Sequence, residues 1–167
     1  MTETRLPEPW LRGTHTDIRS VQRAAIHALE LAEEDLEKWC GDLTKEQLNA
    51  RPSGVAPVAF HIRHIARSID RLLTYAEGLQ LDARQVAALN TELDAGATHD
   101  GLFAELNGGV ARGVARIRAI DPIKLEESRH VGKRQLPTSV GGLLVHVADH
   151  TQRHVGQAIT TAKLVRS

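Results

Sequence analysis

The sequence predicts an all-α protein, and within that class a four-helix bundle. Four long stretches repeat apolar residues at the spacing of one helical face, and none shows the strict apolar and polar alternation of a strand. Capping and helix-stopping residues separate these stretches. The length of 167 residues suits one domain. We therefore expect a single domain over residues 1–167, with residues 1–14 as an irregular N-terminal arm.

The first two long helices are predicted on either side of a short connecting helix. Apolar residues recur through residues 17–40 on one buried face. Thr44 and Gln47 match a capping box, which indicates the start of the short helix. The second long helix should begin at Pro57, a residue suited to a first helical turn, and Gly78 should stop it.

A long connection over residues 78–101 separates the second long helix from the third. Its helical pattern is weak, and its second half should be a loop. Asp100 can cap the third long helix, and Pro122 follows its end. Each glycine within a helix costs about 1 kcal/mol relative to alanine, so three in this one predict close approach of a neighbouring backbone. These are Gly108, Gly109 and Gly113.

The fourth long helix should follow a polar loop and run almost to Ser167. Either Thr138 or Ser139 can cap its start. Its inward residues recur at helical spacing, and they are Leu144, Val147, Val155, Ala158 and Ala162. A bundle is the economical way to bury the apolar faces of four such helices.

Composition narrows the functional classes. Lys plus Arg and Asp plus Glu number 21 each, so no basic surface for nucleic acid is expected. No apolar run is long enough for a membrane helix, and residues 1–13 lack the apolar centre of a secretory signal. We expect a soluble, cytoplasmic protein. The lone Cys40 permits no internal disulfide or thiolate cluster, and we expect it to be a small core residue.

The histidines carry the main chemical signal. Five of the nine fall in two groups, which are His61 with His64, and His146, His150 with His154. Positions four apart on a helix lie one above the other, so His150 and His154 can chelate one ion. A facing helix can supply a third ligand from His61 or His64, and periodicity slightly favours His61. The alternative is that these rings are structural or solvated.

Two segments resemble the DinB-like superfamily of bacterial metal-binding four-helix bundles. They are VAFHIRHIARSIDRLL at 58–73 and LLVHVADHTQRHVGQAIT at 143–160. The family's last helix carries two histidines four apart, then glycine and glutamine, a pattern matched here by His150, His154, Gly156 and Gln157. The resemblance implies metal ligands at His64, His150 and His154. It also implies an up-down-down-up bundle with a long crossover between the second and third long helices, and often a homodimer.

Imidazole ligands suit zinc or nickel, and also iron, cobalt or manganese. Characterised relatives use low-molecular-weight thiols such as mycothiol or bacillithiol, which implies a metal-dependent thiol S-transferase or isomerase, or a hydrolase, acting on a small molecule. The alternative is a non-catalytic, stress-related bundle in which the metal is structural or absent. Four residues are expected around the ligands, namely His61, His146, Asp149 and Gln157.

Overall fold

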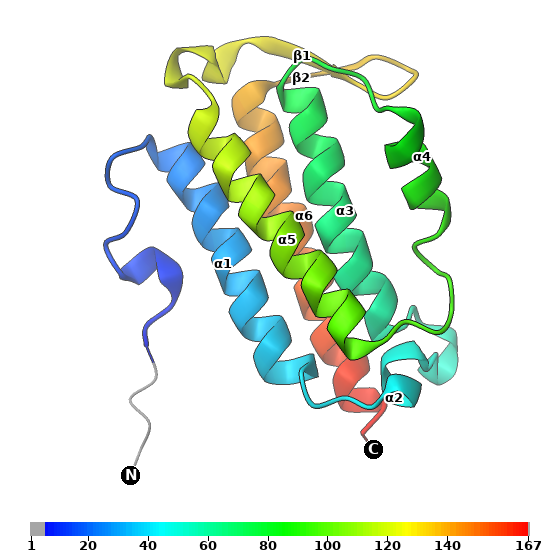
Figure 1. The fold of residues 1–167 in the computed structure, drawn as a ribbon. Coiled ribbons are helices and arrows are strands. Elements are labelled where there is room, and N and C mark those ends of the chain that lie inside the picture. The colour runs from blue at the N-terminus through cyan, green and yellow to red at the C-terminus, as the bar shows by residue number, and fades with distance from the viewer. Residues whose placement is uncertain (1–5, 167) are drawn as a thin grey trace.

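Four long helices lie side by side in the computed structural model, which describes residues 6–166 (Figure 1). They are α1 (Ser20–Cys40), α3 (Val58–Ala76), α5 (His99–Ala119) and α6 (Val140–Leu164). Contacts run from α1 to α6, from α6 to α3, from α3 to α5 and from α5 back to α1, so the helices enclose a common core. No helix in this part of the chain is long and apolar enough to cross a bilayer.

The core consists of the apolar stripes that the sequence shows. Residues three and four apart on each helix point inward, and many of their side chains are fully buried. The largest include Ile26, Leu29, Leu36, Ile62, Ile65, Ile69, Leu106, Ile117 and Leu144. Burying one such side chain stabilises a fold by about 1.5–3 kcal/mol, so apolar contact contributes strongly to the packing of α3 against α6.

Two short helices have the same capping arrangement. The predicted box at α2 (Lys45–Asn49) is confirmed: Thr44 Oγ1 accepts from the Gln47 amide, and Gln47 Oε1 accepts from the Thr44 amide. In the long connection, Asp82 and Gln85 make an equivalent box at the start of α4 (Ala83–Asn90). These bonds satisfy backbone amides that a helix start otherwise leaves unpaired.

The ends of the long helices differ from the prediction in detail. Helix α1 begins at Ser20, three residues after the predicted start. Thr98 caps α5 through a 3.3 Å bond to the Gly101 amide, so the prediction of Asp100 as the cap is wrong. Asp100 instead lies in the first turn, where the helix dipole also favours an acid. Of the two candidates for α6, Ser139 is the cap.

Glycines on α5 allow the close packing that their number predicts, at two of the three positions. A Cβ on Gly113 would lie 2.7 Å from Cγ2 of Ile69, and one on Gly109 would lie 3.1 Å from Cβ of Ala66. Both positions therefore need glycine because α3 passes so near. Gly108 is the exception, since it faces only the guanidinium of Arg112 on its own helix.

A two-stranded hairpin corrects the expectation of no strands. Strands β1 (Ser128–Val131) and β2 (Leu136–Ser139) pair antiparallel, before α6 begins. With four residues each and little burial, they lack the alternating pattern that reveals longer strands. The turn between them uses positive φ angles at Gly132 and Gln135. The 3-10 helix Pro122–Glu126 connects α5 to the hairpin.

The N-terminal arm is described from residue 6 onward, and the part of the predicted arm before it lies outside the described residues. A 3-10 turn at Pro9–Leu11 packs against α1 through the buried Pro9. Arg12 extends this contact with two hydrogen bonds to Glu34, 2.6 and 2.8 Å long. A similar 3-10 turn, Pro52–Gly54, leads into α3.

Candidate metal centre

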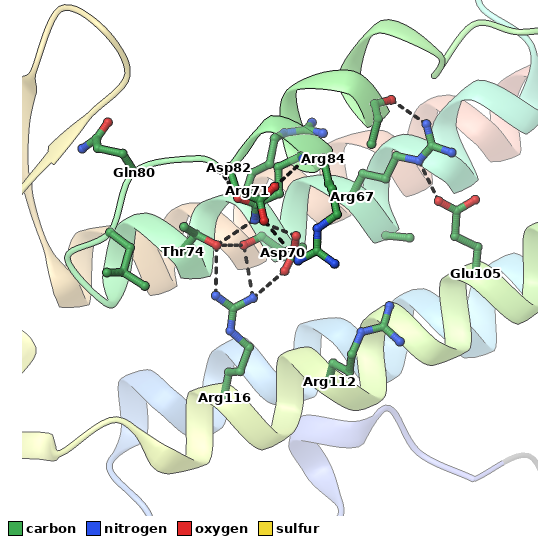
Figure 2. Close-up of a pocket in the computed structure, with 14 residues that line it drawn as sticks. Arg67, Asp70, Arg71, Thr74, Gln80, Asp82, Arg84, Glu105, Arg112 and Arg116 are labelled. Atoms are coloured by element: carbon green, nitrogen blue, oxygen red, sulfur yellow. Dashed lines mark hydrogen bonds and ion pairs between the residues drawn. The ribbon is translucent and has the colours of Figure 1, made fainter.

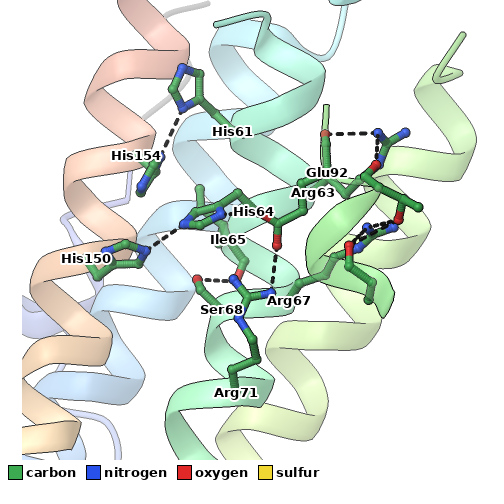
Figure 3. A network of polar contacts seen from close by, with 12 residues as sticks. His61, Arg63, His64, Ile65, Arg67, Ser68, Arg71, Glu92, His150 and His154 are labelled. Atoms are coloured by element: carbon green, nitrogen blue, oxygen red, sulfur yellow. Dashed lines mark hydrogen bonds and ion pairs between the residues drawn. The ribbon is translucent and has the colours of Figure 1, made fainter. Parts of the chain in front are cut away.

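Three histidine rings meet where α3 packs against α6 (Figure 3). One nitrogen from each of His64, His150 and His154 lies within 4.8 Å of the other two. The closest pair is Nε2 of His64 and Nε2 of His150, 2.8 Å apart. The ring centroid of His154 is 4.3 Å from that of His64 and 4.6 Å from that of His150. We call these three residues the histidine triad.

The helix sequences explain why the rings meet. On α6 the buried stripe includes Val147, Thr151 and Val155. His150 and His154 each precede a residue of this stripe, so they flank it on one side and are only half-buried. The two are one turn apart and project together toward α3.

Glu92 holds the His64 ring from the side away from the triad. Its Oε2 lies 2.6 Å from Nδ1 of His64, and Arg71 donates to its Oε1 over 2.7 Å. Glu92 is only 4% exposed; burial alone would raise its pKa, but the bonds from His64 and Arg71 outweigh this and lower it. The ionised carboxylate can only accept, so Nδ1 of His64 carries a proton and Nε2 is the ring nitrogen directed at the triad.

The position of Glu92 depends on α3. Nη1 of Arg63 donates to three backbone oxygens of the loop after α4, those of Thr91, Glu92 and Asp94. This clamp fixes the loop against α3 and directs the Glu92 side chain inward. Sequence reasoning missed Glu92, because it lies in the weakly patterned connection and no helical spacing relates it to a histidine.

His61 contacts the triad through His154. Their Nδ1 atoms are 3.0 Å apart, so one ring donates to the other and Nε2 of His154 faces the triad. Burial, and then the nearby His64, lower the pKa of His61 to about 4. A neutral His61 can therefore accept the Nδ1 proton of His154. Periodicity slightly favoured His61 as a ligand, but the structure brings His64 into the group and places His61 behind it.

Two of the three triad rings, those of His150 and His154, are neutral imidazoles near pH 7. Burial and the neighbouring rings lower the pKa of His150 and of His154 to about 4. Neutral imidazole is the form that binds a metal ion. The donor set therefore fits a divalent metal ion. In the described part of the chain the group contains three side chains, a number typical of sites that leave a coordination position to water or substrate.

The other residues expected around the triad lie further out. His146 is exposed, with its ring centroid 5.3 Å from that of His150. Asp149 pairs with Arg153 over 2.6 Å. Gln157 lines a groove of about 600 Å³ that also includes His61. In the part of the chain that the structure describes, only His61 of the four expected residues makes a hydrogen bond to a triad ring.

Comparison with known proteins shows the family and a similar fold. The family model of the DinB superfamily matches residues 28–158, which contain the whole triad. The fold is similar to the crystal structure of a conserved protein from Enterococcus faecalis. The TM-score is 0.63, the sequence identity is 20%, and the match covers 89% of this chain and 98% of that one. No curated protein matches significantly. Because the family model covers most of its length, the chain belongs to the DinB superfamily.

Proposed function

We propose that this chain is a metal-dependent enzyme in which His64, His150 and His154 hold one divalent ion. We propose zinc or nickel as the ion, and a small molecule as the substrate. The convergence of three imidazoles, two of them held neutral by burial and one oriented by a buried carboxylate, carries the proposal. A metal ion held by three protein ligands can lower the pKa of a bound water or thiol and polarise a carbonyl.

The protein residues have separate tasks in this proposal. Glu92 fixes the tautomer and orientation of His64, and His61 does the same for His154. Arg71 keeps the buried Glu92 ionised. These contacts pre-orient the ligands, so little rearrangement is needed when an ion binds. Such orientation of the ligands by outer partners is common in metal enzymes.

Thiol S-transfer or isomerisation, with a low-molecular-weight thiol as co-substrate, is the reaction type we favour, and hydrolysis is the second. The groove beside His61 supports a small-molecule substrate, since its volume of about 600 Å³ is in the range of ligand pockets. Phe60 and Leu164 give it apolar walls, and Arg153 and Gln157 add polar groups.

A non-catalytic, stress-related bundle with a structural or absent metal is the competing function. A structural metal normally has four protein ligands, and its removal unfolds the domain. Here the group contains three side chains, and apolar packing already joins α3 to α6. We therefore expect chelation to remove activity while the helical fold remains.

A panel assay tests the enzymatic proposal. Metal-loaded protein is incubated with low-molecular-weight thiols and electrophiles, and separately with ester and amide substrates. His150→Ala should lose turnover, whereas His130→Ala, which removes a histidine from the distant hairpin, should retain it. Equal rates for the wild type and His150→Ala across the panel would contradict the enzymatic proposal. Unfolding on chelation would favour the structural metal instead.

We also propose the up-down-down-up order of helices that the resemblance implies. Helix α3 lies beside α5, and residues 77–98 between them, eight of which form α4, can span about 58 Å, more than the roughly 28 Å length of α3. Such a connection is long enough to cross from one end of the bundle to the other. Association as a homodimer is a further proposal, and light scattering that gives twice the 18.3 kDa of one chain would support it.

A further inference from the structure

A second cleft lies between α3, α4 and α5 (Figure 2). Its volume is about 520 Å³, enough for a small metabolite. The short helix α4 forms one wall, and residues of α3 and α5 form the others. The triad histidines do not line it, so it is a separate site from the candidate metal centre.

The lining of this cleft is rich in arginine. Five arginines line it, together with three carboxylates, which leaves a formal excess of two positive charges. The arginines are Arg67, Arg71, Arg84, Arg112 and Arg116. Four of them have acidic partners: Arg67 pairs with Glu105, Arg71 with Glu92, Arg84 with Asp82, and Arg116 with Asp70. The paired carboxylates fix the positions of these side chains. Glu92, and Glu77 which also pairs with Arg116, lie outside the lining and neutralise the formal excess, so the charge that no carboxylate pairs is that of Arg112.

Arg112 is the arginine without such a partner. No other described residue makes a hydrogen bond or ion pair with it, although its side chain lines the cleft. Gly108, one turn earlier on α5, leaves room for it: a Cβ at Gly108 would lie 3.1 Å from Nη1 of Arg112. The guanidinium of this exposed residue therefore lies along the helix, and no described residue accepts a hydrogen bond from it. An arginine without a protein acceptor is well suited to bind phosphate or carboxylate oxygens through paired hydrogen bonds.

The remaining lining indicates a metabolite rather than a bare ion. Leu79 adds an exposed apolar surface, and Gln80 adds an amide. A ligand with an oxyanion group and a short organic body would use both features.

We propose that this cleft binds a small metabolite carrying a phosphate or carboxylate group, with Arg112 as its main anchor. The proposal goes beyond the metal-dependent function and does not require it. Arg71 takes part in both regions, because it lines the cleft and also holds Glu92. Arg112 is therefore the residue to change, since it makes no contact with the metal centre's partners.

The test is a titration of the metal-loaded, full-length protein followed by amide chemical shifts in NMR, at constant ionic strength. Inorganic phosphate and succinate are the probes. We expect saturable shifts confined to amides around the cleft on α3, α4 and α5. Arg112→Gln should raise the probe concentration at the midpoint of the titration about tenfold, because a charged hydrogen-bonding group is lost. Arg134→Gln, which removes the same charge from the hairpin turn, should leave it unchanged.

The two probes separate the sources of the anionic group. Tighter binding of phosphate would indicate a phosphorylated metabolite, and tighter binding of succinate would indicate a carboxylate, both within the proposal. Linear shifts without saturation, or the same midpoint in Arg112→Gln, would overturn it. Shifts centred on residues 150–154 would also overturn it, because the anion would then occupy the metal centre. None of these results would show whether the triad binds metal, so the two proposals can fail separately.

Discussion

The carboxylate of Glu92 lies 2.6 Å from Nδ1 of His64, although 28 residues separate them along the chain. The carboxylate is buried, and Arg71 binds its other oxygen. This contact selects the tautomer of His64 that directs Nε2 to the triad. A loop side chain thereby determines how a helix side chain can bind metal.

Replacing Glu92 should weaken metal binding without removing the site. Glu92→Gln keeps the size of the side chain but loses the charge that fixes His64, so we expect metal affinity to fall by about 10- to 100-fold. Competition with a chelator of known affinity measures this. Glu105→Gln is the matched control, because Glu105 pairs with Arg67 outside the triad. Equal affinities for both variants would show that Glu92 does not orient the ligand.

Two glycines on α5 should respond oppositely to the same change. Gly113→Ala places a Cβ 2.7 Å from the Ile69 side chain, so we expect a loss of about 1–3 kcal/mol in unfolding free energy from overpacking. Gly108→Ala meets only the end of the flexible Arg112 side chain, so we expect a gain of up to about 1 kcal/mol from helix propensity. Urea denaturation measures both. A stabilising Gly113→Ala would contradict the close approach of α3.

Cys40 should behave as a buried core residue. Its side chain is 0% exposed, and burial raises the pKa of the thiol to about 12. A thiol-specific reagent at pH 8 should therefore label native protein far more slowly than protein unfolded in guanidinium. Cys40→Ala should retain full metal content. Fast labelling of the native protein would show that the thiol is accessible.

Glu33 should make stability depend on pH. Burial, and then the neighbouring Glu30 and Glu34, raise the pKa of this half-buried carboxyl from 4.5 to about 7. The folded state therefore holds its proton more tightly than the unfolded state. The resulting stability is present below pH 4.5 and is lost as pH rises through about 7.

Glu33→Gln, which cannot ionise, should therefore melt at a higher temperature than the wild type at pH 8 and at nearly the same temperature at pH 4. Thermal unfolding at the two values measures the difference. Glu37→Gln removes the same charge from an exposed position of α1 and serves as the control. A gain for Glu33→Gln that is equal at both pH values would rule out the titration of Glu33 as its cause.

The four long helices could be predicted because their signals are local. Stripes such as Ile62, Ile65 and Ile69 repeat at the helical period, and the capping box at Thr44 lies within four residues. The hairpin escaped prediction because its strands have four residues and depend on pairing with each other. The predicted helix ends differ from the observed ones by a few residues, because several polar side chains near the start of a helix can each serve as its cap, as Thr98 and Asp100 can.

The candidate site was predictable only in part. The spacing of His150 and His154 shows a shared helical face, but periodicity slightly favours His61 over His64, because His64 is turned further toward the polar side of α3. That choice depends on how α6 docks and on where the loop after α4 places Glu92. Contacts of this kind join residues far apart in sequence, so no local pattern reveals them.

The most direct test of the central claim is elemental analysis of untagged protein, reconstituted with zinc or nickel. The wild type should hold about one ion per chain. Alanine at His64, His150 or His154 should abolish this, whereas His61→Ala should weaken binding but keep the stoichiometry, because His61 stands behind His154. A wild type that holds no ion after reconstitution, or a His64→Ala variant that holds a full equivalent, would contradict the account.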